Sequence, residues 1–278
     1  MTRQTRFDLA EETALAADFL RRGYVIMPVE DGAALDEIRA ELVRIAATEA
    51  NLDAGDDPAG FLNGFHRHVN AAQINDIRVA TYNGMNANDW FRPTYFGLVR
   101  RTIETLVGNE LAMQNKINLS IQMPHDTGSV LSIHADQFDG QTPFEVVAWL
   151  PMVDVHDTKS MFIITPEKNR EMMSRLSEFE HVGMQAVFEE VRGDATWLKI
   201  PYGHILVFTP TIMHGNVANE VDETRWSFNT RFTGLFTPFT DIPGSEKRLG
   251  GFYLPITPRA VTRIGMTWEP PGGFGRHG

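Results

Sequence analysis

The stretch that decides the fold is residues 203–232, GHILVFTPTIMHGNVANEVDETRWSFNTRF. It opens with an apolar run, GHILVFTP, and closes with a run in which polar and mostly aromatic residues alternate, TRWSFNTRF. Both runs are short, rich in β-branched and aromatic residues, and bounded by Pro, Gly or Asp, which predicts two β-strands. His214 lies just after the first strand, and Arg225 opens the second. These two strands therefore position the first candidate functional residues, His214 and Arg225.

Further runs of the same kind occur from residue 116 onward: KINLSIQMP, FEVVAWLPMV, SMFIITP and TWLKIP. Several such runs without helices between them predict an antiparallel sandwich or barrel. One helical insert, over 168–191, is expected to interrupt them, because its apolar residues recur at helical spacing.

The N-terminal part follows helical periodicity instead. A first helix is expected from Asp8, which has capping-box spacing to Glu11, to a stop at Gly23. A short strand, YVIMPV (24–29), comes next. A second helix has apolar residues every three or four positions: Leu35, Ile38, Leu42 and Ile45. Residues 51–68 lack periodicity and predict a long loop, of a length that is usually functional or mobile.

These patterns predict one domain of mainly β class over 1–278. We expect a mostly helical layer over 1–110, packed on a jelly roll (a double-stranded β-helix, cupin-like) over 111–240. Residues 241–278 then form a C-terminal extension. With 42% hydrophobic residues, 18 Phe and 5 Trp, the composition is that of a folded chain with a sizeable core and excludes a disordered one.

Charge and cysteine content exclude several function classes. A net charge of −11 argues against a broad nucleic-acid surface, which would be basic. The absence of cysteine removes disulfides, thiol nucleophiles and iron–sulfur ligation, so any metal must bind His, Asp or Glu. The start of the chain has no apolar signal region, and no window approaches the ~18 to 20 apolar residues of a membrane span. We expect a soluble, cytoplasmic protein that acts on a small molecule. The sequence does not indicate its oligomeric state.

Three residues are candidates for a metal site: His134, Asp136 and His214. If His134-Ala135-Asp136 lies in a strand, the first and third residues share a face and can approach one ion. The spacing alone carries little information, since a chain with nine histidines contains such pairs by chance. Two histidines and one carboxylate, with open positions opposite them, suit non-haem Fe(II) oxygen chemistry. The open positions would accept O₂ and a bidentate 2-oxo acid such as 2-oxoglutarate.

A 2-oxoglutarate co-substrate also needs a cation for its far carboxylate, and the planar fork of Arg225 meets that need. The strand that Arg225 opens has one polar face, with Ser227 next to Arg225 on it, and the strand KINLSIQ has another, with Asn118 and Gln122. One such strand alone would suggest a solvated outer face. Two of them, both flanking the candidate ligands, predict a polar pocket that faces inward.

Three basic residues are candidates for substrate binding: Lys116, Lys159 and Arg231. Arg231 lies on the same strand face as Arg225 but six residues on, roughly 20 Å away along an extended strand, too far to share one carboxylate. It could bind an anionic group of the substrate, such as a phosphate. The alternative is a surface ion pair with Asp222 or Glu223, and for Lys159 simple surface exposure.

With these residues in place, the chain resembles the phytanoyl-CoA-dioxygenase-like superfamily of Fe(II)/2-oxoglutarate oxygenases. The resemblance spans roughly 7–235 and rests on FLRRGYVIMPV, on HAD at 134–136, and on the interval from His214 to Arg225. It implies that Trp149 and Asn216 lie near the co-substrate. It also implies oxidative decarboxylation of 2-oxoglutarate, coupled to oxidation of a substrate C–H bond.

A narrower likeness is to a bacterial subgroup associated with carbohydrate and aminoglycoside gene clusters, through NLSIQMP, GQTPFEVVAWLPMVDVHDTKSMFI and HGNVANEVDETRWSFNTRFTGLF. It implies a small polar substrate of carbohydrate-like character. Two other functions stay open. One is a metal-dependent cupin-type isomerase, epimerase or hydrolase, which would have no role for Arg225 and Ser227. The other is a non-catalytic jelly roll that binds a ligand.

Overall fold

The computed structural model describes residues 9–239 and 246–269. Its helices are α1 (Ala10–Arg22), α2 (Gly32–Ala50), α3 (Pro58–Asn63), α4 (Ala71–Asn86), α5 (Phe91–Gly97), α6 (Arg100–Leu106), α7 (Pro166–Arg175), α8 (Met184–Val191) and α9 (Ala260–Thr267). Its strands are β1 (Tyr24–Pro28), β2 (Leu111–Gln114), β3 (Asn118–Gln122), β4 (Glu145–Pro151), β5 (Phe162–Ile164), β6 (Ala195–Trp197), β7 (His204–Phe208), β8 (His214–Gly215), β9 (Arg225–Gly234) and β10 (Tyr253–Pro255).

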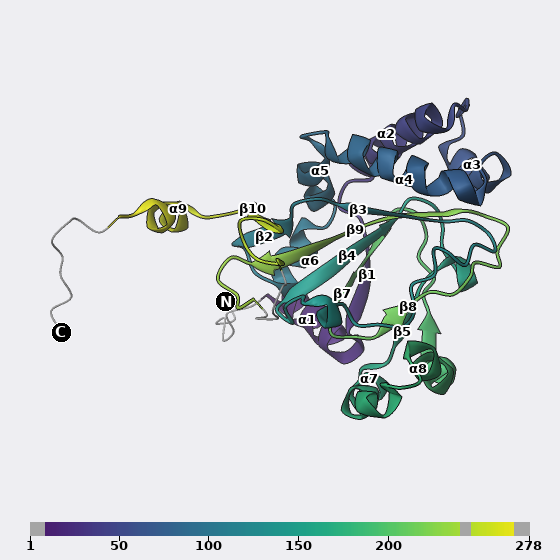
Figure 1. Ribbon diagram of the computed structural model, residues 1–278. Coiled ribbons are helices and arrows are strands. Elements are labelled where there is room, and N and C mark those ends of the chain that lie inside the picture. The colour runs from purple at the N-terminus through teal and green to yellow at the C-terminus, as the bar shows by residue number, and fades with distance from the viewer. Residues whose placement is uncertain (1–8, 240–245, 270–278) are drawn as a thin grey trace, which may run out of the picture.

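The described strands form two antiparallel sheets (Figure 1). The larger sheet has the order β1-β7-β4-β9-β2-β10, and β3 pairs with the first half of β9, on the same edge that β2 uses further along. The smaller sheet has the order β6-β5-β8. β9 is the centre of the larger sheet, because it pairs with β4 along one edge and with β3 and β2 along the other.

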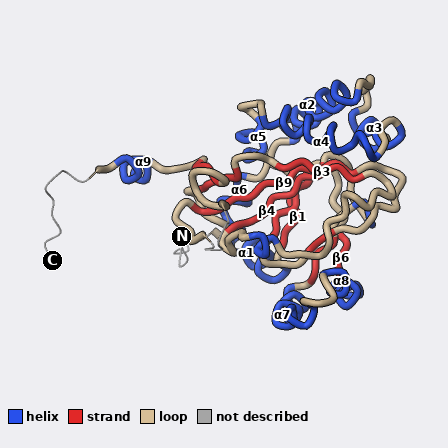
Figure 2. The backbone as a smooth tube through the Cα atoms, in the orientation of Figure 1, coloured by secondary structure: helices blue, strands red, loops and turns tan. Residues whose placement is uncertain are grey.

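Helices lie on both sides of this framework (Figure 2). α2 to α5 cover the outer face of the larger sheet, whereas α7 and α8 lie beside β5 and β8 on the opposite side (Figure 1). The aromatic face of β9 makes the helix contact. Trp226 packs edge-on against Phe65 at 5.0 Å between ring centroids, and Phe228 packs against Phe91 at 5.0 Å. The other face of β9, which begins with Arg225, therefore points away from the helical layer and toward the smaller sheet.

The N-terminal elements differ from their predicted form in detail. The first helix ends at Gly23, whose φ of 78° is left-handed, and a Cβ there would lie 2.6 Å from Ile212. At its start the carboxylate of Glu12, not of Glu11, accepts a hydrogen bond from the backbone N–H of Leu9. The expected cap, Asp8, lies outside the described residues. The four apolar positions of the second helix are all buried.

Two predicted segments contain more structure than expected. The long loop over 51–68 contains α3, whose N-terminus is capped by the Asp57 carboxylate. The insert over 168–191 is not one helix but two, α7 and α8. Three short strands, β2, β8 and β10, were not predicted at all. The expected C-terminal extension, 241–278, lies partly outside the described residues, and in its described part α9 extends away from the sheets (Figure 1).

No helix in the described parts of the chain combines the length and the apolar character needed to cross a bilayer.

Candidate metal centre

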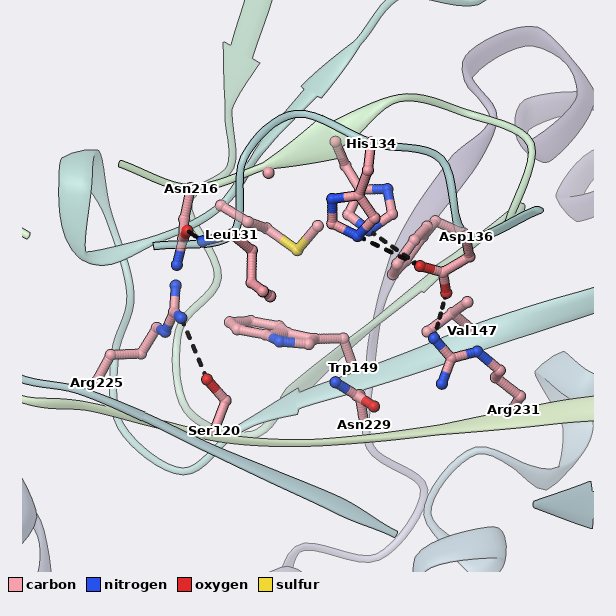
Figure 3. Close-up of a pocket in the computed structure, with 14 residues that line it drawn as sticks. Ser120, Leu131, His134, Asp136, Val147, Trp149, Asn216, Arg225, Asn229 and Arg231 are labelled. Atoms are coloured by element: carbon pink, nitrogen blue, oxygen red, sulfur yellow. Dashed lines mark hydrogen bonds and ion pairs between the residues drawn. The ribbon is translucent and has the colours of Figure 1, made fainter. Parts of the chain in front are cut away.

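The two candidate histidines are brought together by backbone pairing. The N–H of His134 donates to the carbonyl of His214 at 2.9 Å, and the N–H of His214 donates to the carbonyl of His134 at 2.8 Å. This isolated bridge places the imidazole rings side by side, 4.5 Å apart between centroids. Asp136 follows two residues later. It does not continue a strand, as predicted, but opens a 3-10 helix (Asp136–Asp139), and its carboxylate still turns toward both rings (Figure 3).

The ligand atoms converge on one point. Oδ1 of Asp136 lies 3.5 Å from Nε2 of His134 and 3.7 Å from Nε2 of His214. The Nδ1 atom of each ring lies within hydrogen-bond distance of a backbone carbonyl, that of Ser132 at 2.7 Å and that of Ile212 at 3.0 Å. A carbonyl can only accept, so Nδ1 carries the proton and the Nε2 lone pair is free for a metal. The three side chains could together hold one ion.

The electrostatics of the site favour the forms that bind a metal. Burial lowers the pKa of His214 to about 4, so this imidazole is neutral at pH 7. Burial alone would raise the pKa of Asp136, but the hydrogen bond from His134 and the charge of Arg231 hold it well below its usual range. Burial opposes protonation of His134 too, but its bond to Asp136 raises the net pKa. A divalent ion would displace that proton, as metal binding to histidine generally does.

The three ligands open onto a cavity of about 110 Å³. A single water needs ~10 to 15 Å³ of cavity volume, so the cavity has room for a small molecule beside an ion. Trp149 lies across its middle, with Arg225 at one end and Arg231 at the other (Figure 3). Polar and apolar side chains together line it: Ser120, Leu131, His134, Asp136, Val147, Trp149, Met161, Phe208, His214, Gly215, Asn216, Arg225, Asn229 and Arg231.

Arg225 is a buried cation without a counter-charge. Its residue is 3% exposed, and its one hydrogen bond to a described residue is a long one, 3.4 Å from Nη2 to the hydroxyl of Ser120. Its Nε is buried and has no partner, and no carboxylate in 9–239 or 246–269 forms an ion pair with it. Burial lowers the pKa of Arg225 to about 10, which still leaves it charged at pH 7. A buried unpaired charge is unfavourable, so this end of the cavity is suited to an anion.

The other residues predicted near the co-substrate divide into two groups. Trp149 and Asn216 line the cavity. The remaining three do not line it. Asn118 donates from its amide to Asn229 at 3.0 Å, Gln122 donates to the carbonyl of Val217 at 2.7 Å, and Ser227 is fully buried with its hydroxyl unpartnered.

Two lining residues, Ser120 and Asn229, were not singled out from the sequence. Both belong to the alternating polar positions of β3 and β9. The signal that could have found them is the one that identified Arg225. All three occupy the same face of two paired strands, with Ser120 opposite Ser227 in the register.

The two candidate lysines are not in the cavity. Lys159 is fully buried, where its ammonium donates to Asn63 at 2.8 Å and to the Glu223 carboxylate at 2.6 Å. It therefore joins the end of α3 to the loop that contains Glu223, and it is not a surface residue. Lys116 is exposed on an outer hollow beside Tyr82 and Phe252. Neither of these candidate substrate residues therefore lines the cavity.

Arg231 lines the cavity but is paired there. Its Nη2 donates to Oδ2 of Asp136 at 2.5 Å, and its Nη1 donates to Gln114 at 3.2 Å. The alternative, a surface pair with Asp222 or Glu223, is wrong, because the side chain is only 12% exposed and lies beside a metal-ligand candidate. The strand spacing predicted that Arg231 lies apart from Arg225, and the two side chains are at opposite ends of the cavity (Figure 3). It could not show that Asp136 would lie at the far end.

Comparison with known proteins agrees with this architecture. No protein-family model and no curated protein matches the chain. Among solved structures it is similar to AviO1 from Streptomyces viridochromogenes Tue57, with a TM-score of 0.53, 14% identity, and coverage of 85% of this chain and 100% of that one. It is similar to a non-heme monooxygenase, ThoJ in complex with nickel, with a TM-score of 0.51, 16% identity, and coverage of 79% and 77%.

A third similar structure is HygX from Streptomyces hygroscopicus with nickel and 2-oxoglutarate bound. Its TM-score is 0.50 at 12% identity, with coverage of 88% of this chain and 96% of that one. At these identities the likeness shows a shared fold. The chain therefore shares the fold of AviO1, ThoJ and HygX, and it has a His-Asp-His cluster that could hold a metal in its cavity.

Proposed function

We propose that this chain is an Fe(II)- and 2-oxoglutarate-dependent dioxygenase on a double-stranded β-helix, and that it oxidises a C–H bond of a small polar metabolite. One observation carries the proposal. A His-Asp-His cluster and a buried arginine without a counter-charge line the same small cavity.

The residues present fit the metal and the co-substrate. Two imidazole nitrogens and one carboxylate oxygen on one side of an ion are the donor set of non-haem Fe(II) oxygenases. 2-Oxoglutarate carries a chelating 2-oxo acid at one end and a second carboxylate at the other. Arg225 would bind that second carboxylate, with help from the Ser120 hydroxyl. When bound, Fe(II) would supply O₂ activation and the decarboxylation of 2-oxoglutarate to succinate and CO₂.

The protein's own part is to orient the groups and to exclude water. Arg225, deep in the cavity, fixes the distance of the co-substrate from the metal ligands. Trp149 lies between the two ends and gives that stretch an apolar surface (Figure 3). Electrostatic interactions are stronger in such a site than in water. The Nδ1 bonds to backbone carbonyls hold both imidazoles with Nε2 toward the cavity.

The similar structures support the proposal by what they contain. HygX was solved with nickel and 2-oxoglutarate, and also with iron. We infer that the same co-substrate occupies the Arg225 end here. The substrate is proposed to be polar and carbohydrate-like. The reason for expecting a phosphate on it no longer stands, because Arg231 is engaged by Asp136.

The test is succinate release with Fe(II), O₂ and 2-oxoglutarate across a library of sugars, aminocyclitols and acyl carriers. We expect succinate and oxidised product in equal amounts for one polar class. Conversion of a substrate without succinate would instead indicate the isomerase or epimerase. A purified protein that retains neither Fe(II) nor Ni²⁺ would indicate a jelly roll that only binds ligand.

A further inference from the structure

Arg231 is the centre of a buried polar cluster behind the metal-ligand candidates. Its guanidinium makes two hydrogen bonds, from Nη2 to Oδ2 of Asp136 and from Nη1 to Gln114 at 3.2 Å. Its Nε has no hydrogen-bond partner among the described residues but lies 3.7 Å from Oε1 of Glu145, within ion-pair distance. Two hydrogen bonds from different nitrogens of a planar guanidinium define its orientation.

The cluster reaches back through three further strands. Glu145, on β4, is 3% exposed and accepts a short hydrogen bond from the hydroxyl of Tyr253, on β10. Gln114, on β2, lies opposite Tyr253 in the strand register. Arg231 itself is on β9. Four paired strands thus fix the position of one guanidinium, which makes the cluster a rigid support and not a flexible surface pair.

The two oxygens of Asp136 consequently have different partners. Oδ1 faces Nε2 of both histidines, at 3.5 and 3.7 Å, whereas Oδ2 faces Arg231 (Figure 3). A free carboxylate can bind an ion through one or both oxygens. Here the second oxygen is already bound by a strong, charge-assisted donor.

We propose that Arg231 is a positioning residue, which keeps Asp136 a ligand through Oδ1 alone and so preserves the open metal positions that a chelating 2-oxo acid needs. This inference rests on the proposed function, since it assumes a metal at His134, Asp136 and His214. Support of this kind from outside the ligand set typically changes metal affinity or activity by ~10- to 100-fold.

The rival interpretation is that Arg231 and Asp136 form only a structural ion pair. The two interpretations predict opposite signs. A positive charge beside a ligand repels a divalent ion, so if the pair is merely structural, removing Arg231 leaves Ni²⁺ affinity equal or higher. If Arg231 positions Asp136, its removal frees the carboxylate to rotate, and both Ni²⁺ affinity and 2-oxoglutarate affinity fall.

The experiment measures binding to metal-loaded protein without turnover. Ni²⁺ is titrated calorimetrically into wild type, Arg231→Met, Arg231→Lys and the control Arg39→Met, and 2-oxoglutarate is then titrated into each Ni²⁺ form. Arg39 is a suitable control because it pairs with Asp36 and stacks on Tyr202 away from the cavity. The visible spectrum of each Co²⁺ form reports the coordination directly.

We expect Arg231→Met to lose ~10-fold or more in Ni²⁺ affinity, and a further ~10-fold in 2-oxoglutarate affinity, with a changed Co²⁺ spectrum. Arg231→Lys should recover part of this loss and Arg39→Met should show none. Should Arg231→Met not fold, Tyr253→Phe removes only the support of Glu145 and should weaken both affinities by about threefold, in proportion to its remoteness.

The outcomes separate this inference from the proposed function. Unchanged or tighter Ni²⁺ binding by Arg231→Met or Tyr253→Phe, with an unchanged Co²⁺ spectrum, overturns the positioning role and leaves the proposed function intact. A wild-type protein that binds no Ni²⁺ overturns the proposed function itself.

Discussion

Replacing Arg225 by Met tests the proposed site most directly, because it should move stability and ligand affinity in opposite directions. In the ligand-free protein the Arg225 guanidinium is buried, with a single 3.4 Å hydrogen bond to a hydroxyl. Methionine fills similar space without charge. The variant should therefore be at least as stable as the wild type, whereas its affinity for 2-oxoglutarate should fall.

The structure sets the size of both effects. Burial lowers the pKa of Arg225 from 12.5 to about 10, and one pKa unit corresponds to ~1.4 kcal/mol. The charge is thus ~3.5 kcal/mol less favourable in the cavity than in water. Leaving a buried charge without its partner costs ~2 to 5 kcal/mol in binding, a range that includes this figure. Since 1.4 kcal/mol is tenfold in affinity, we expect a loss of roughly 300-fold.

The assay is calorimetric titration of 2-oxoglutarate into Ni²⁺-loaded protein, together with urea unfolding of the metal-free and the Ni²⁺-loaded forms. In the wild type, 2-oxoglutarate at 100 times its Kd should stabilise the Ni²⁺ form by ~2.7 kcal/mol. Arg225→Lys should recover only part of the affinity, because an ammonium lacks the fork. Arg92→Met is the matched control. Its guanidinium bonds two backbone carbonyls, so it should lose stability and keep 2-oxoglutarate affinity.

Two results would refute the reasoning. If Arg225→Met binds 2-oxoglutarate within twofold of the wild type, the arginine is not the anchor. If metal-free Arg225→Met is less stable than the wild type by more than ~2 kcal/mol, the guanidinium of Arg225 makes stabilising interactions in the ligand-free protein and is not an unpaired charge.

Three further changes have defined outcomes. His214→Ala should abolish Ni²⁺ binding in calorimetry while circular dichroism stays native, and retained stoichiometric binding would exclude His214 as a ligand. Burial raises the pKa of Glu145 from 4.5 to about 7, so the folded state holds this proton more tightly than the unfolded state does. The contribution of Glu145 to the free energy of unfolding of the metal-free protein should therefore fall by up to ~3 kcal/mol as the pH rises from 4.5 to 7. Urea unfolding of Glu145→Gln should not show this decrease. Identical pH profiles of stability for the variant and the wild type would contradict the prediction. Asn216→Ala removes the acceptor for the N–H of Leu131 and the donor to the carbonyl of Ser129, so protease should cut this loop faster and 2-oxoglutarate affinity should fall severalfold; equal cleavage rates would count against this.

The polar face of the site could be predicted from the sequence because strand periodicity is a local property. In β9 the residues with aromatic partners, Trp226 and Phe228, alternate with Arg225 and Asn229, and a period of two separates the faces whatever the rest of the chain does. The helical layer was predictable for the same reason. Leu35 and its successors recur at helical spacing, and all of them are buried.

What could not be predicted depends on contacts between distant parts of the chain. β8 has only two residues, so it is too short to be predicted from hydrophobic periodicity. Its backbone bridge nevertheless places His214 beside His134. Asp136 was selected as a candidate ligand on the assumption that it shares a strand face with His134. In the structure it lies in a 3-10 helix, and its carboxylate turns toward both histidines from there. Lys159 has a polar, loop-like sequence context, and its burial arises only when Asn63 and Glu223 are folded onto it.

The two arginines of β9 show most clearly where sequence reasoning ends. Arg225 and Arg231 have the same chemistry, the same strand and the same face, and nothing local distinguishes them. The fold does so through counter-charges. It places two carboxylates, Asp136 and Glu145, within 4 Å of Arg231 and none of the described ones beside Arg225. An arginine that is paired with carboxylates contributes rigidity, whereas a buried arginine without a carboxylate partner remains able to bind an anion. The different roles that we propose, positioning of Asp136 by Arg231 and binding of 2-oxoglutarate by Arg225, follow from this difference in pairing.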